Sequence, residues 1–206
     1  MSSKPGCIET VSGLEVNPLT LSPDDLRIGD ITVSLSNICR FNGSVAIHYS
    51  VAQHSLLVCD LTAAILEPLV ARQLRAQQET FRRQALLTAL LHDAAEVYIG
   101  DVMRPLQGFL KQWKPAEIML TRTILRRFGA QTGGEVAGIV DIADNAALLL
   151  EAQNLKRSRG IGWGLLPATA DDSRYWVEPV DALEARAGFF NRFQELFKEP
   201  ARLRAD

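Results

Sequence analysis

Residues able to bind a metal ion occur along the chain in the order His, His-Asp, Asp: His54, His92 with Asp93, and Asp144. Two imidazoles and two carboxylates suit Mn, Fe, Co, Ni or Zn better than Ca²⁺. Taken alone, a His-Asp pair arises often by chance, and a single His in an apolar helix is more often a core residue. The combination is a sharper signal, because burying carboxylates is costly without a partner charge and a divalent cation supplies one.

Glu96 extends this pattern. It lies four residues after His92 and three after Asp93, so on a helix it borders the surface that they occupy. Adjacent helical residues point about 100° apart, so His92 and Asp93 reach one ion only where another helix crosses theirs. A carboxylate there can act as a general acid or base if burial tunes its pKa. The remaining histidine, His48, has no obvious role as a further ligand, and we therefore expect one metal ion.

Helical signals surround these residues. Ser50 and Gln53 form a predicted capping box, Gly100 and Gly129 are placed to end helices, and Pro115 is placed to start one. Apolar residues recur between these signals at helical spacing. The sequence therefore predicts five helices, over about residues 55–69, 79–99, 115–128, 135–157 and 180–198.

The two ends of the chain differ from its middle. The first 37 residues contain β-favouring residues interrupted by Pro18 and Pro23, which favours short strands or irregular structure, although residues 22–25 also resemble a helix start. A glycine-rich loop over residues 159–179, either a lid or only a connection, separates the last two helices.

We expect an all-α helical bundle with a short irregular or β N-terminal segment. The chain is predicted to be a single domain, 1–206, with an N-terminal extension (1–37), a metal-site core (38–158), and a loop with a C-terminal helix (159–206).

Composition restricts the class of protein. With 206 residues, of which 47% are hydrophobic and 22% charged, the chain is long enough to bury its own core. A formal net charge of −2 gives no general attraction to nucleic acid or to an anionic membrane. The three cysteines (Cys7, Cys39, Cys59) form no CxxC pair, and the start of the chain has no signal-peptide pattern. Apolar runs are too short for a membrane span, so we expect a cytoplasmic protein with reduced thiols.

Three segments together resemble the HD-domain phosphohydrolases. They are Tyr49-Ser-Val-Ala-Gln-His54-Ser, Leu-Leu-His92-Asp93-Ala-Ala-Glu96-Val-Tyr-Ile-Gly-Asp101 and Ile-Ala-Asp144. Within that superfamily they are most similar to bacterial 5′-deoxynucleotidases and to phage deoxyadenosine-triphosphate hydrolases. The segment Cys39-Arg40-Phe41-Asn42-Gly43 also resembles the substrate-binding segment of those enzymes, and the similarity covers about residues 28–155.

The resemblance implies a role for each matching residue. The four residues of the His, His-Asp, Asp pattern match the metal ligands. Glu96 matches the acid that handles the proton of the attacking water or leaving oxygen, and Asp101 matches a residue near the sugar and reacting phosphate. Arg40 and Phe41 match an Arg-aromatic pair that contacts phosphate, sugar and base, with Phe where Trp is often found. Arg104 belongs to a further part of the phosphate-binding segment.

The expected function is hydrolysis of a nucleotide phosphate, with a 5′-deoxynucleotidase that releases phosphate from dNMPs as the leading hypothesis. A dNTP triphosphohydrolase is the alternative within enzymes, and a non-catalytic HD-fold nucleotide-sensing module is the alternative from another class. We expect one divalent ion (Co, Mn, Zn, Fe or Ni) as cofactor and a small-molecule nucleotide as substrate. No nucleic acid or membrane partner is expected, and the chain is expected to form a homo-oligomer, a dimer or higher. Base preference and native metal are left open.

Overall fold

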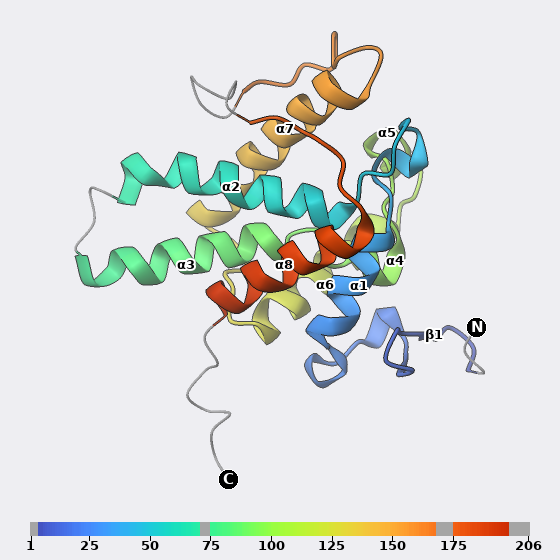
Figure 1. Ribbon diagram of the computed structural model, residues 1–206. Coiled ribbons are helices and arrows are strands. Elements are labelled where there is room, and N and C mark those ends of the chain that lie inside the picture. The colour runs from blue at the N-terminus through green and yellow to red at the C-terminus, as the bar shows by residue number, and fades with distance from the viewer. Residues whose placement is uncertain (1–3, 71–74, 168–174, 198–206) are drawn as a thin grey trace.

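The computed structural model describes residues 4–70, 75–167 and 175–197 (Figure 1). Short elements come first: β1 (Ile8–Glu9), β2 (Glu15–Val16), η1 (Pro18–Thr20) and η2 (Pro23–Asp25). The elements that follow are helical: α1 (Ile28–Asn37), η3 (Arg40–Gly43), α2 (Val51–Val70), α3 (Arg75–Leu91), α4 (Glu96–Ile99), α5 (Arg104–Gln107), α6 (Trp113–Arg127), α7 (Glu135–Leu155) and α8 (Ala182–Leu196). The predicted all-α fold with a short N-terminal β segment is confirmed.

Helix α2 lies at the centre of the bundle. Helix α3 runs beside it, α7 crosses it, and α8 packs against α1, α2 and α3 (Figure 1). The side chains between these helices are fully buried and almost all apolar, as at Val58 and Leu61 of α2 and Leu87 and Leu90 of α3. Burial of this kind stabilises by about 1.5–3 kcal/mol for each large apolar side chain. A polar side chain on the inner face of α2 is therefore surrounded by packed helices, which fix its position.

The N-terminal part contains both a confirmed and a wrong prediction. Strand β2 pairs antiparallel with β1, with Ile8 opposite Val16, in the region where short strands were expected. Residues 28–37, in contrast, form a helix and no strand. Ile31 and Leu35, one helical turn apart, are both fully buried, and α1 packs against α8. The β preference of its Ile, Thr and Val residues is therefore overridden by tertiary packing, as propensities of this size commonly are.

The helix predicted over residues 79–99 is interrupted. Helix α3 ends at Leu91, a turn of four residues follows, and α4 begins at Glu96. Within the turn, the amide of Ala94 donates to the Leu91 carbonyl (3.1 Å) and the amide of Glu96 to the Asp93 carbonyl (3.0 Å), so the spacing is tighter than in an α-helix. His92 and Asp93 thus lie outside regular helix, and the divergence of adjacent helical side chains does not apply to them.

The start of α2 is capped, although not by the full capping box that was predicted. The Ser50 hydroxyl accepts from the amide of Gln53 at 3.2 Å. The Gln53 side chain does not return to the Ser50 amide. Instead its Nε2 donates to the Glu178 carbonyl (2.7 Å) and its Oε1 accepts from the Val180 amide (3.1 Å). The prediction was wrong because Gln53 ties the segment before α8 to the first turn of α2.

The other predicted helices agree with α6, α7 and α8 to within about two residues, the usual uncertainty of a helix boundary. The predicted end of the last helix at residue 198 falls outside the described residues. Among the helices described, none has the length and apolar character required to cross a membrane.

Candidate metal centre

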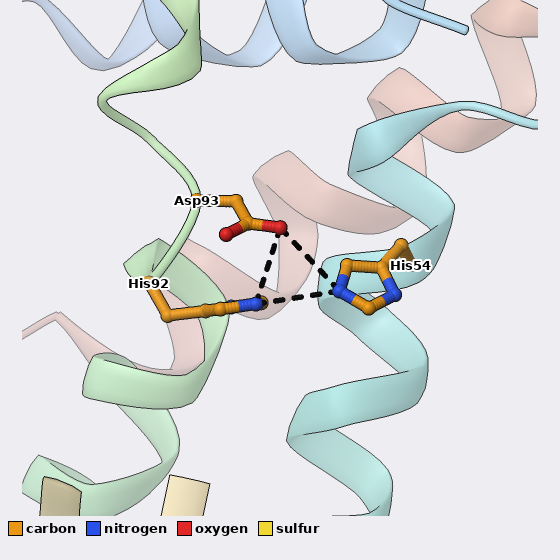
Figure 2. Close-up of side chains that lie close together, drawn as sticks. All are labelled: His54, His92 and Asp93. Carbon is orange, nitrogen blue, oxygen red and sulfur yellow. Dashed lines mark hydrogen bonds and ion pairs between the residues drawn. The ribbon is translucent and has the colours of Figure 1, made fainter. Parts of the chain in front are cut away.

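Side chains from three separate parts of the chain converge at the first turn of α2. His54 projects from α2 toward His92 and Asp93 in the turn after α3 (Figure 2). The two Nε2 atoms lie 3.3 Å apart, and the Asp93 Oδ2 lies 3.4 Å from His54 Nε2 and 3.2 Å from His92 Nε2. From α7, the Asp144 Oδ1 lies 3.2 Å from His54 Nε2 and 4.0 Å from His92 Nε2. The four residues predicted as ligands are thus brought together.

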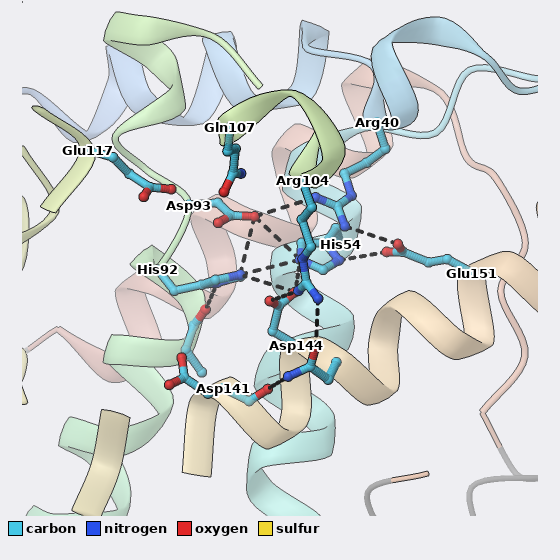
Figure 3. Close-up of polar contacts among 12 residues, drawn as sticks. Arg40, His54, His92, Asp93, Arg104, Gln107, Glu117, Asp141, Asp144 and Glu151 are labelled. Atoms are coloured by element: carbon cyan, nitrogen blue, oxygen red, sulfur yellow. Dashed lines mark hydrogen bonds and ion pairs between the residues drawn. The ribbon is translucent and has the colours of Figure 1, made fainter. Parts of the chain in front are cut away.

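Each histidine is oriented by an acceptor at its other ring nitrogen. His92 Nδ1 donates to the Ala89 carbonyl at 2.7 Å, and His54 Nδ1 lies 2.6 Å from the Glu151 carboxylate (Figure 3). Sequence reasoning missed Glu151. Its signal was present, because Glu151 stands seven residues after Asp144 in an apolar helix, which places both carboxylates on one face of α7 two turns apart.

The electrostatics of the cluster favour a cation. Burial by itself lowers the pKa of His54 and of His92, but the carboxylates around them raise both above the ordinary imidazole value. Burial by itself raises the pKa of Asp93 and of Asp144, but the two imidazoles hold both below the ordinary carboxyl value. The carboxylates therefore attract positive charge to the space between the four side chains.

The donor set fits a divalent transition metal. It offers two neutral imidazole nitrogens and two carboxylate oxygens, which is a combination common to Zn, Mn, Fe, Co and Ni sites. The three donors His54, His92 and Asp93 are close enough to bind one ion together, and Asp144 borders them from α7. His48 takes no part, because it is exposed and its Nε2 lies 3.4 Å from the Asn37 carbonyl.

Two further carboxyl groups, at Glu96 and Asp101, flank the metal-binding cluster. Glu96 is buried in the first turn of α4, and its Oε2 has no hydrogen-bond partner among the described residues. Burial, and then the charges of Asp93 and Asp101, raise the pKa of Glu96 well above its usual range. Asp101 follows the end of α4 at Gly100 and is half-buried, and burial raises its pKa as well. Raised pKa values favour the protonated forms of both carboxyl groups, which suits them to donate or accept a proton.

Arg40 approaches the cluster from η3. Its amide donates to the Tyr49 carbonyl at 2.8 Å, which fixes its backbone beside the start of α2. Its side chain is 11% exposed, and its guanidinium lies between two carboxylates, with Nη1 3.6 Å from Asp93 Oδ2 and Nη2 3.2 Å from Glu151 Oε2 (Figure 3). A guanidinium is therefore held next to the donor atoms, where a phosphate oxygen would add to its partners.

Phe41 occupies an unusual backbone conformation beside Arg40. Its φ is 57° and that of Asn42 is 51°, a left-handed geometry that residues other than glycine adopt rarely. The Phe41 ring lies 5.0 Å from Lys156 Nζ and 6.5 Å from the ring of Trp163, on the loop after α7. In this backbone conformation the ring lies beside that loop.

Arg104 begins α5 and reaches the cluster at Asp144. Its Nη2 donates to Asp144 Oδ2 and its Nη1 to Asn145 Oδ1, each at 2.6 Å, and the side chain is 48% exposed (Figure 3). Arg104 therefore holds the outer oxygen of Asp144 and leaves the other oxygen, Oδ1, directed at the imidazoles.

The fold and the site together, a helical bundle with two imidazoles and two carboxylates beside its central helix, are those of a metal-dependent hydrolase. The model of the HD domain family matches residues 51–158, more than half of the chain, and the chain belongs to this family of metal-dependent hydrolases. The matched range includes all four converging side chains.

Two relatives are similar to the chain over most of its length. The chain is 32% identical over 189 residues to the uncharacterized protein YfdR of Escherichia coli K12, with 92% of this chain and 94% of YfdR covered. It is 33% identical over 150 residues to an uncharacterized protein of Rhodobacter capsulatus, with 70% of each covered. Neither relative has a described activity or substrate. The expected similarity to 5′-deoxynucleotidases and phage dATP hydrolases therefore stays a prediction.

Proposed function

We propose that this HD-domain protein hydrolyses nucleotide phosphates and that its substrates are deoxynucleoside 5′-monophosphates. The observation that carries the proposal is the convergence of His54, His92, Asp93 and Asp144 next to the guanidinium of Arg40. Four donors of this kind would hold one divalent ion. When bound, such an ion polarises a phosphoryl oxygen and lowers the pKa of a water molecule beside it.

The chain's own residues supply the remaining steps. Arg40 binds a non-bridging phosphate oxygen and so orients the phosphorus toward the donor cluster. Glu96 accepts a proton from the attacking water or donates one to the leaving 5′ oxygen, because burial raises its pKa and so favours the protonated form more than in an ordinary carboxyl group. Asp101, close to Glu96, binds the sugar hydroxyl or shares the proton.

The charges at the site favour a monophosphate over a triphosphate. The cluster contains the carboxylates of Asp93, Asp144 and Glu151, and its two guanidinium groups, Arg40 and Arg104, are already paired with them. With Glu96 and Asp101 protonated, one bound divalent ion leaves a small positive excess, which suits a phosphate dianion. A triphosphate carries about twice that charge and is usually held by additional cationic groups.

The test is a substrate screen on purified protein treated with EDTA and then supplied with Mn²⁺ or Co²⁺. We expect release of inorganic phosphate from dNMPs, no turnover after EDTA, and recovery with either metal. The products distinguish the alternatives, because a triphosphohydrolase releases tripolyphosphate from dNTPs. Full activity in metal-free protein, or binding of nucleotides without any product in the presence of metal, would contradict the proposal, and the second result would favour a nucleotide-sensing module.

A further inference from the structure

Glu151 is a fully buried carboxylate that none of the steps above uses. It lies on α7 with no exposed surface. A buried carboxylate costs several kcal/mol unless hydrogen bonds and opposite charges compensate it. Its Oε1 lies 2.6 Å from His54 Nδ1 and its Oε2 lies 3.2 Å from Arg40 Nη2. Both oxygens are therefore engaged, each with a different part of the candidate site.

The contact with His54 determines which ring nitrogen carries the proton. The Oε2 of Glu151 pairs with the guanidinium of Arg40 at 3.2 Å, the arrangement of an ionised carboxylate. An ionised carboxylate only accepts hydrogen bonds, so His54 Nδ1 must donate. The lone pair of the neutral ring is then on Nε2, the atom that lies 3.2–3.4 Å from Asp93 and Asp144.

His92 is also protonated at Nδ1, but its acceptor is a backbone carbonyl. His92 Nδ1 donates to the backbone carbonyl of Ala89 at 2.7 Å, an acceptor that no side-chain substitution can remove. His54 lies on the central helix α2 and uses a side chain from α7 instead. Glu151 is therefore the one of these two acceptors that mutagenesis can change.

The contact with Arg40 links the donor cluster to the phosphate-binding guanidinium. Arg40 Nη2 bonds to Glu151 while Nη1 faces Asp93 at 3.6 Å, so the planar group is held from both sides (Figure 3). A guanidinium held in this way loses little freedom when it adds a phosphate oxygen to its partners.

We propose that Glu151 is a positioning residue with two roles: it fixes the Nδ1–H tautomer and ring orientation of His54 for metal binding, and it aligns the guanidinium of Arg40 for the phosphate. The second role rests on the proposed function, and the first does not. Acceptors of this kind typically change metal affinity or activity by about 10- to 100-fold when they are removed.

Two substitutions separate the roles. In Glu151→Gln the amide oxygen can still accept from His54 Nδ1, but the amide NH₂ faces Arg40 and cannot pair with it. In Glu151→Met both contacts are lost at similar volume. Glu195→Gln, an exposed carboxylate on α8, is the matched control. Circular dichroism and thermal melting establish whether each variant is folded. If Glu151→Met is not folded, the His54 tautomer in the wild type still tests the first role, and Glu151→Gln tests the second.

The first readout uses Co²⁺ alone and needs no substrate. Titration against a chelator, followed by the visible absorption of Co²⁺, should give a Co²⁺ affinity about 10- to 100-fold weaker for Glu151→Met. The affinity for Glu151→Gln should lie within a few-fold of wild type. Nitrogen-15 spectra of the histidine rings should show His54 protonated at Nδ1 in the wild type and in Glu151→Gln, and a mixture of tautomers in Glu151→Met. Wild-type Co²⁺ affinity and an unchanged His54 tautomer in Glu151→Met would overturn the first role.

The second readout is kinetic. Glu151→Gln saturated with metal should raise KM for a dNMP by about 10-fold or more with a smaller change in kcat, because the guanidinium is misaligned while the ligands are kept. Wild-type KM in this variant would overturn the second role. If the wild-type protein hydrolyses no nucleotide at all, the proposed function fails, whereas the role toward His54 still stands or falls on the Co²⁺ and nitrogen-15 measurements.

Discussion

Glu96 and Asp93 lie three residues apart in the chain but are expected to respond differently to substitution. Glu96→Gln removes a proton-handling group that does not belong to the metal-binding cluster, so metal content should stay near wild type while kcat falls by roughly 10²- to 10⁴-fold. Metal analysis and steady-state kinetics on a dNMP measure the two quantities.

Asp93→Asn is the comparison, because Oδ2 of Asp93 faces both imidazoles and this variant should lose metal and activity together. If Glu96→Gln retained wild-type kcat, Asp101 would have to carry the proton.

Phe41 permits a test of whether the nucleoside is recognised. Its ring lies beside Trp163 and Lys156 at the edge of the site, and stacking of a base on an aromatic ring contributes about 1–3 kcal/mol. Phe41→Leu should therefore lower kcat/KM for a dNMP by about 5- to 150-fold and leave p-nitrophenyl phosphate nearly unaffected.

Phe190→Leu, at a partly exposed aromatic residue of α8, controls for the loss of a surface ring. Equal losses on both substrates in Phe41→Leu would mean that the segment shapes the fold and does not contact the base.

At the level of single residues, the sequence was informative where residue type alone limits the chemistry. The order His54, His92-Asp93, Asp144 predicted that these side chains would lie together, as they do in the structure. Few other roles require two imidazoles and two carboxylates in apolar segments. Glu151 was missed for the opposite reason, since a carboxylate within a helix is ordinarily solvated and its burial depends on Arg40, more than a hundred residues away. The same holds for Arg104, whose pairing with Asp144 cannot be read from either residue alone.

The elements that support the site depend on a few backbone positions. Gly100 ends α4 with φ 79° and ψ 160°, a region that only glycine adopts readily, and no heavy atom lies close to the position of a Cβ there. Gly100→Ala should thus destabilise by about 1–3 kcal/mol from backbone strain alone. It should also lower activity, since Asp101 follows directly. Urea unfolding measures the first effect and dNMP turnover the second.

Gly138→Ala provides the control with opposite sign. Gly138 lies on the exposed side of α7 in helical conformation, with open space around it. Alanine should raise stability there by about 0.5–1 kcal/mol and leave turnover unchanged. A stabilising Gly100→Ala would show that the end of α4 is not held in its present conformation.

Periodicity predicted the long helices well and the interruptions poorly. Apolar spacing predicted α6, α7 and α8 because their buried stripes are continuous. It could not reveal the turn between α3 and α4, since residues 92–95 contain no glycine or proline to mark a helix end and Ala94 and Ala95 favour helix. Helix α1 was misassigned because its Ile and Val content favours strands until the packing against α8 is known.

For the molecule as a whole, the site links stability to pH and metal. In metal-free protein the pKa values of His54 and His92 are raised, so their protonated forms stabilise the fold. This contribution is complete below the ordinary imidazole pKa of about 6.5 and is lost as pH rises through the raised values. The melting temperature of EDTA-treated protein should therefore fall as the solution is made alkaline. Thermal melts at constant ionic strength measure it.

Metal should reverse that trend. The imidazoles bind an ion only after losing their protons, so added Mn²⁺ or Co²⁺ should stabilise more at high pH than at low pH. His48→Gln, which alters an exposed histidine outside the cluster, should behave as wild type in both series. A metal-free melting temperature that rises across this interval would contradict the assigned electrostatics.

The separation in sequence between the partners of the site has a consequence for protein synthesis. His54 and Glu151 lie 97 residues apart, and Asp144 also belongs to α7. A nascent chain emerging from the ribosome can pair α2 with α3 early, because those helices are neighbours in sequence. At that stage it has both histidines and Asp93, but lacks Asp144 and the acceptor that orients His54. We therefore expect the ion to be acquired late, by a nearly complete chain, and not to guide the first helices together.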